Sequence, residues 1–118
     1  MRKFLTVTIA LSLIATGAAI AAKPKAMSKA ARRGQAFAEE RCAACHGITI
    51  NSSSANPESP PFADVANRPG VTQASLHRFL RDSHNFPEAM QFTVDRAKIH
   101  DLSAYIITLR KPGYKPSI

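Results

Sequence analysis

Two cysteines followed directly by a histidine constrain this chain more than any other feature. The segment Cys42 to His46 reads CAACH, and the sequence contains no further cysteine. Paired thiols at this spacing have three chemical interpretations: a redox-active disulfide, half of a zinc site, or a covalent attachment site for haem. Each interpretation requires something different from the rest of the chain.

The first two interpretations lack support elsewhere in the sequence. A thioredoxin-like redox pair lies at a strand-to-helix junction of a βαβ unit, and no segment here alternates as a strand would. A zinc site needs further ligands, but no second cysteine pair exists and the other histidines are scattered. A haem site needs only the histidine that follows the second cysteine. On a helical turn the thiols of Cys42 and Cys45 match the two vinyl groups on one haem edge, and His46 falls beneath the iron. We therefore predict one covalent haem c.

The first residues predict export. Arg2 and Lys3 precede an apolar run from Phe4, and small residues follow up to Ala22, which is the pattern of a secretory signal. Cleavage is expected between residues 19 and 22, and most readily after Ala21. The uncharged run is also close to the roughly 20 residues that span a bilayer, so an uncleaved anchor is the alternative. Either way we expect a periplasmic domain, where haem is attached to such sites.

The rest of the chain suffices for one small domain. We predict a signal peptide at 1–21, a basic lead-in at 22–33, a haem domain at 34–112 and a tail at 113–118. The net charge is +8. Six cations lie in or near the lead-in: Lys23, Lys25, Lys29, Arg32, Arg33 and Arg41.

This charge has two interpretations. It is either a solvated basic arm or a means of docking to an acidic redox partner or an anionic membrane surface. A lasting membrane attachment is expected only if the signal remains as an anchor. Nucleic acid is not an expected partner, because the chain is exported and has no recognisable binding module.

Apolar periodicity predicts an all-α domain with three main helices and irregular loops. We expect these helices at about residues 29–41, 73–82 and 93–109, with Ser28, Thr72 and Thr93 as their caps. One short turn is expected at 62–66, and the prolines before it exclude a continuous helix. The last helix has an inner stripe of Ile99, Leu102, Tyr105, Ile106 and Leu109.

The iron needs a ligand on the face opposite His46, and Met90 is the leading candidate. It lies in the irregular stretch before the last helix, and a thioether opposite histidine raises the reduction potential. Its other interpretation is a core methionine that fills space. His84, six residues earlier, is the rival ligand and would lower the potential. His77 and His100 adjoin charged residues, so we expect them to face solvent.

Together these features resemble a class I cytochrome c of the short bacterial kind, over about residues 34–109. The family has an amino-terminal helix before the CxxCH motif, and a carboxyl-terminal helix crosses it. Gly34 corresponds to the family's close-packed glycine, and Leu102 with Tyr105 to its partners. A glycine within a helix costs about 1 kcal/mol relative to alanine, which is consistent with a close crossing. The aromatic residue usual four positions before the first cysteine is replaced by Ala38, beside Phe37.

The resemblance also implies a proline carbonyl that accepts a hydrogen bond from the axial histidine. Pro61, or else Pro60, fits that role, although a plain turn proline is the other interpretation. Such an acceptor orients the ring and increases its basicity. Gln91 stands where many relatives have a proline after the ligand methionine.

The function that the resemblance implies is the transfer of single electrons between redox partners, without enzyme activity of its own. One alternative is a haem subunit of a periplasmic dehydrogenase or oxidase complex. Another is a peroxidase or gas sensor, which requires an open sixth position on the iron. The residues expected along the haem pocket wall are Phe62, Phe79, Phe86, Phe92 and Ile106.

Overall fold

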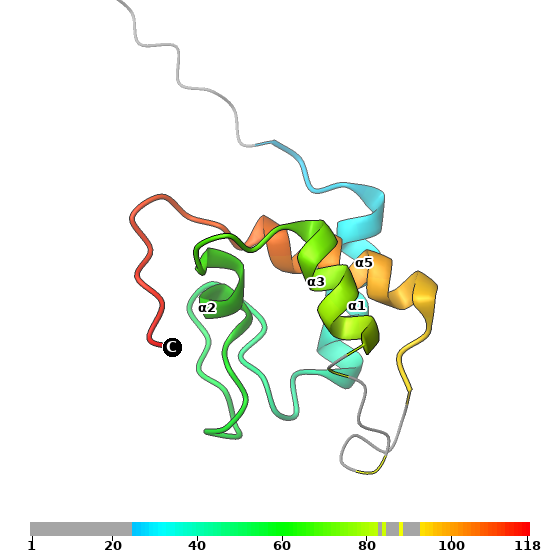
Figure 1. Ribbon diagram of the computed structural model, residues 1–118, viewed down its shortest axis with the longest axis horizontal. Coiled ribbons are helices and arrows are strands. Elements are labelled where there is room, and N and C mark those ends of the chain that lie inside the picture. Colours follow the sequence, from blue (N-terminus) through cyan, green and yellow to red (C-terminus); the bar gives the residue numbers. More distant parts are fainter. Residues whose placement is uncertain (1–24, 83, 85–87, 89–92) are drawn as a thin grey trace, which may run out of the picture.

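The computed structural model describes residues 25–82, 84, 88 and 93–118, and within these residues it is helical without strands. The helices are α1 (Lys29–Arg41), α2 (Phe62–Asn67), α3 (Gln73–Asp82) and α5 (Arg96–Thr108), as Figure 1 shows. The all-α prediction is confirmed, and α1 and α3 have the predicted bounds. In the described part of the chain no helix has the length and apolar character needed to cross a membrane.

Two of the three predicted helix caps are confirmed. The Ser28 hydroxyl accepts a hydrogen bond from the Ala31 amide at 3.1 Å, and the Thr72 hydroxyl accepts one from the Ser75 amide at 3.0 Å. The third prediction, Thr93, is wrong. Asp95 is the cap of α5, and its carboxylate accepts the Lys98 amide hydrogen at 2.9 Å. A carboxylate satisfies a free amide and also complements the positive end of the helix.

Helices α1 and α5 cross in direct backbone contact at Gly34. A β-carbon at this position would collide with the Asp101 carbonyl and lie 2.9 Å from the Leu102 nitrogen. Beside the crossing, the guanidinium of Arg33 donates two hydrogen bonds to the Asp101 carboxylate, at 2.6 and 2.7 Å. The close crossing expected at Gly34 is therefore confirmed.

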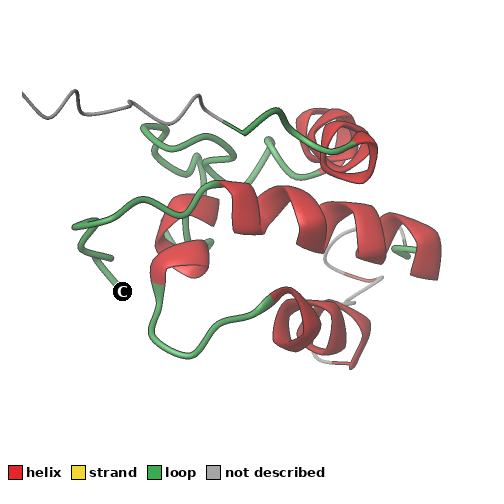
Figure 2. Ribbon diagram, turned by 90° about the horizontal axis from the view of Figure 1, so that it is seen from above, coloured by secondary structure: helices red, strands yellow, loops and turns green. Residues whose placement is uncertain are grey.

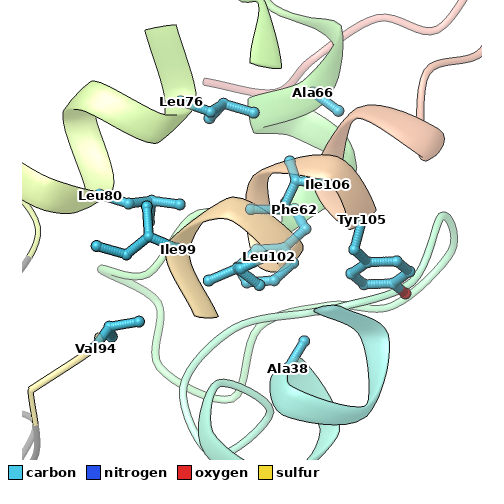
Figure 3. Packing of buried hydrophobic residues seen from close by; sticks show 10 residues of the cluster. All are labelled: Ala38, Phe62, Ala66, Leu76, Leu80, Val94, Ile99, Leu102, Tyr105 and Ile106. Atoms are coloured by element: carbon cyan, nitrogen blue, oxygen red, sulfur yellow. The ribbon is translucent and has the colours of Figure 1, made fainter. Parts of the chain in front are cut away.

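Helix α5 lies between α1 on one side and α3 on the other, as Figure 2 shows. Its predicted inner stripe forms the centre of the core, except that Leu109 is only partly buried and ends the helix. The remaining helices each add one or two side chains to the same cluster (Figure 3). The cluster consists of Ala38, Phe62, Ala66, Leu76, Leu80, Val94, Ile99, Leu102, Tyr105 and Ile106.

The carboxyl-terminal segment folds back onto α2. Asp64, in the first turn of α2, is 2% exposed. Its carboxylate accepts hydrogen bonds from the Tyr114 hydroxyl at 2.6 Å, from the Ser117 amide at 3.1 Å and from the Ser117 hydroxyl. A buried carboxylate is stable only when its oxygens have such partners, so these contacts fix the tail to the domain.

Candidate functional site

The CAACH segment forms a single turn that continues from the end of α1. Cys42 caps the helix, and its amide donates to the Ala38 carbonyl at 2.9 Å. The Cys42 carbonyl then accepts hydrogen bonds from the amides of Cys45, at 3.0 Å, and His46, at 2.8 Å. Both thiols are unpaired; Cys42 is half-buried and Cys45 is exposed. The turn thus brings both thiols and the imidazole together at the end of one helix.

The thiol of Cys42 is in an environment unsuited to redox exchange. Burial, and secondarily the nearby Cys45 thiol, raises the pKa of Cys42 to about 11. A redox-active CxxC cysteine needs the opposite shift, because only the thiolate is nucleophilic. The described residues also contain no group of three or more metal-binding side chains. The site therefore fits haem better than either of the other two interpretations.

His46 is held in a fixed orientation by the backbone of Pro60. Its Nδ1 lies 2.7 Å from the Pro60 carbonyl oxygen. With this carbonyl as acceptor, Nδ1 carries the hydrogen and Nε2 has a free lone pair for a metal. Such a hydrogen bond also makes the ring a stronger ligand. This is the arrangement that the sequence predicted, but with the other proline.

The first choice for that acceptor, Pro61, is wrong. Pro61 is the amino-terminal cap of α2, and its carbonyl accepts the Val65 amide hydrogen at 3.1 Å. That carbonyl points along the helix as its first hydrogen-bond acceptor. The carbonyl of Pro60, one residue earlier, lies outside the helix and is available to His46.

The loop after the motif closes back on it through Gly47. The Gly47 amide donates to the Ser54 hydroxyl at 2.9 Å, and its carbonyl accepts the Phe62 amide hydrogen at 2.7 Å. A β-carbon on Gly47 would collide with the Ser52 carbonyl. Only glycine therefore allows the loop to pack against the motif and deliver Pro60 to His46.

Two rings lie close to His46 in the described residues. The Phe62 ring lies 5.2 Å from it, tilted by 42°, and the His84 ring lies 5.8 Å from it, almost perpendicular. Phe79 stacks on His84 at 5.7 Å and is 51% exposed. Burial, with a smaller effect of His46, lowers the pKa of His84, so this imidazole is neutral at pH 7.

The remaining predicted site residues are distributed unevenly. Ile106 and Phe62 are buried in the core, whereas Met90, Phe86 and Phe92 lie outside the described residues. His100 is exposed, as expected, but His77 is half-buried. Neither His77 nor His100 contributes to the ring cluster around His46.

Comparison with known proteins decides the family. The family model for cytochrome c matches residues 31–110, which is most of the described domain. The chain belongs to the cytochrome c family. This cytochrome is 35% identical over 85 residues to cytochrome c-552 of Bradyrhizobium diazoefficiens, and the match covers 72% of this chain and 80% of the relative. No solved structure matches the chain significantly. As a cytochrome c it binds covalent haem c and is an electron carrier.

Two hydrogen bonds that support the site were not predicted from the sequence. Gly47 and Ser54 shape the loop, and the Tyr105 hydroxyl donates to the Ile48 carbonyl at 2.8 Å, which ties that loop to α5. The position of Gly47 could have predicted its contact, because glycine directly after the motif permits a close approach of another backbone segment. Tyr105 was expected only as an apolar contact, although a buried tyrosine usually needs a partner for its hydroxyl.

Proposed function

We propose that this cytochrome is a periplasmic carrier that passes single electrons between redox partners through one haem. Cys42 and Cys45 would hold the haem through thioether bonds, and His46 and Met90 would bind its iron. The observation that carries this proposal is the 2.7 Å contact between His46 Nδ1 and the Pro60 carbonyl. It leaves Nε2 free, beside two unpaired thiols on the same turn.

When bound, the haem would supply the redox chemistry, the gain and loss of one electron at its iron. The chain's own residues hold the ligands and exclude water. His46 is fixed through Pro60, which is itself fixed by the adjoining helix α2 and by the bond from Phe62 to Gly47. An imidazole that cannot rotate would keep its position when the charge of the iron changes. Phe62, packed against the His46 ring, removes water from this side.

Two residues compete as the second ligand of the iron. Met90 is favoured because a thioether opposite histidine suits a carrier of raised potential. His84 is the competing ligand, and a specific observation supports it: its neutral ring lies 5.8 Å from that of His46. Absorption spectra of the ferric protein distinguish them, since only methionine ligation gives the weak long-wavelength band from sulfur to iron.

The kind of redox partner is inferred from the expected location of the protein and from its positive charge. Export by the signal at residues 1–21 would place the carrier in the periplasm. The six cations between residues 23 and 41 suit a redox partner with an acidic docking surface, since complementary charge speeds encounter more than it tightens binding. The alternative of a haem subunit is tested by purification. A monomer that several donors reduce supports a free carrier, whereas stoichiometric co-purification with a dehydrogenase or oxidase supports a subunit.

Covalent attachment is tested directly at the two thiols. The double variant Cys42→Ala/Cys45→Ala should release its haem into acidified organic solvent, while the native protein retains it on a denaturing gel. The matched control changes the residues between the thiols, Ala43→Ser/Ala44→Ser, and should retain covalent haem. Retention of haem by the cysteine double variant would refute this attachment.

A further inference from the structure

Two carboxylates are buried in the described part of the chain, and only one of them is balanced by a cation. Asp101 is 5% exposed and accepts two hydrogen bonds from the guanidinium of Arg33, which neutralises its charge. Asp64 is 2% exposed and accepts hydrogen bonds from Tyr114 and Ser117. Within the residues that the structure describes, Asp64 forms no ion pair. Asp64 therefore places a negative charge inside the protein without a cation against it.

The hydrogen bonds keep this carboxyl group ionised at neutral pH. Burial alone would raise the pKa of Asp64, but the bonds from Ser117 and Tyr114 outweigh burial and lower it. The same contact raises the pKa of the Tyr114 hydroxyl, so the phenol remains a neutral donor. A buried carboxylate with only neutral donors retains a full unit of negative charge.

The charge lies on the segment that holds the axial histidine. Asp64 is in the first turn of α2, four residues after Pro60, whose carbonyl lies 2.7 Å from His46 Nδ1. Phe62, between them in sequence, places its ring 5.2 Å from that of His46. Pro60 and Asp64 also line the same hollow, which residues 50–61 share with the tail. Asp64 is therefore close to the haem side of the domain without contacting the imidazole.

We propose that the buried charge of Asp64 lowers the reduction potential of the haem that His46 would ligate. Loss of one electron to a redox partner leaves the haem site one unit of charge more positive. A nearby negative charge stabilises that oxidised state relative to the reduced one. Solvent and salt screen exposed charges, but they screen a buried charge much less. Asp64 would thus set how readily the carrier releases its electron, an inference that rests on the proposed function.

The test measures the midpoint potential of the haem-loaded protein by redox titration at pH 7. Asp64→Asn removes the charge, keeps nearly the same shape, and should raise the potential. We expect a change on the order of tenfold, towards the reduced carrier, in its equilibrium constant with a fixed redox partner. The matched control is Glu58→Gln, which loses the same charge from an exposed side chain of the same hollow. The control should shift the potential far less, and only the Asp64→Asn shift should persist at high salt.

A second variant separates the charge from the support that the tail gives to α2. Ser117→Ala removes one donor to Asp64 but leaves the carboxylate ionised. The lost hydroxyl dipole no longer offsets part of the negative charge, so the potential should fall. If Asp64 acted only by holding the tail, both variants would loosen the same contact and shift the potential in the same direction.

Opposite shifts in Asp64→Asn and Ser117→Ala would support the inference. Shifts of the same sign, or equal shifts in Asp64→Asn and Glu58→Gln, would overturn it. Should Asp64→Asn fail to fold, a potential in Ser117→Ala that stays unchanged or rises would overturn it as well. A native protein without a reversible one-electron couple would instead contradict the proposed function itself.

Discussion

Tyr114 donates a hydrogen bond of 2.6 Å to Asp64 across 50 residues of chain. The pair joins the tail to α2, the helix that directly follows Pro60. The tail, α2 and His46 therefore form a continuous chain of contacts. The tail beyond residue 112, which the sequence suggested as a separate segment, is in physical contact with the elements that support the site.

The Tyr114→Phe substitution removes one oxygen and leaves the buried Asp64 with fewer partners. Loss of a hydrogen bond to a buried charged group costs about 1–3 kcal/mol. We expect the free energy of unfolding of the haem-loaded protein, from urea titration, to fall by that amount. The control Lys115→Ala changes an exposed neighbour and should have little effect. Equal stability of the Phe variant and the native protein would show that the tail contact is not formed in solution.

Acid should destabilise the fold through two carboxylates. The hydrogen bond from Arg33 is the main cause that lowers the pKa of Asp101. Burial alone would raise the pKa of Asp64, but the hydrogen bonds from Ser117 and Tyr114 outweigh it and lower this pKa. An unfolded aspartate titrates near pH 4, so below that pH the unfolded chain binds more protons than the folded one.

The stabilisation from Asp64 and Asp101 is therefore complete above about pH 4. It is lost as the pH falls through the lower pKa values that these carboxyls have in the folded protein. The urea midpoint should drop most steeply below about pH 5, where these two carboxylates begin to be protonated in the unfolded chain. Asp101→Asn should have a lower midpoint at pH 7 and a shallower drop in acid. A parallel drop in that variant would assign the acid sensitivity to other groups.

In Gly34→Ala, helix propensity and packing at the helix crossing should change stability in opposite directions. Propensity alone favours alanine within a helix by about 1 kcal/mol, but the new β-carbon would collide with the Asp101 carbonyl. We expect packing to dominate, with a loss of stability of about 1–3 kcal/mol from overpacking. The control Ala36→Gly, at an exposed position of the same helix, should lose about 1 kcal/mol from propensity alone. A stabilised Gly34→Ala protein would contradict the crossing.

Single substitutions of Met90 and His84 distinguish these two candidate ligands of the iron. Met90→Ala should lower the reduction potential and abolish the long-wavelength sulfur-to-iron band, because the thioether raises the potential. His84→Ala should keep the band and change the potential little. Absence of the band from the native protein, with a change of potential in His84→Ala and little change in Met90→Ala, would assign the second ligand to His84.

The sequence predicted the local features of this protein better than the contacts between distant segments. The CAACH motif and the bounds of α1 and α3 depend on neighbouring residues, and these predictions succeeded. The choice between Pro60 and Pro61 depended on where α2 starts, because the cap residue of a helix uses its own carbonyl. Thr93 failed as a cap since Asp95, two residues later, offers a carboxylate instead of a hydroxyl. The bond from Tyr114 to Asp64 joins segments 50 residues apart, and no local pattern signals it.

The crossing of α1 and α5 has a consequence for the order in which the protein matures. Arg33 and Asp101 are separated by 68 residues, so the central interface does not exist until nearly the whole chain has been made. Chains are synthesised from the amino terminus, and the two thiols emerge well before α5. During that interval the CAACH turn has no α5 to pack beneath it, and both sulfur atoms are accessible. A chain that is exported unfolded would therefore keep both sulfur atoms accessible until the last helix docks and completes the fold.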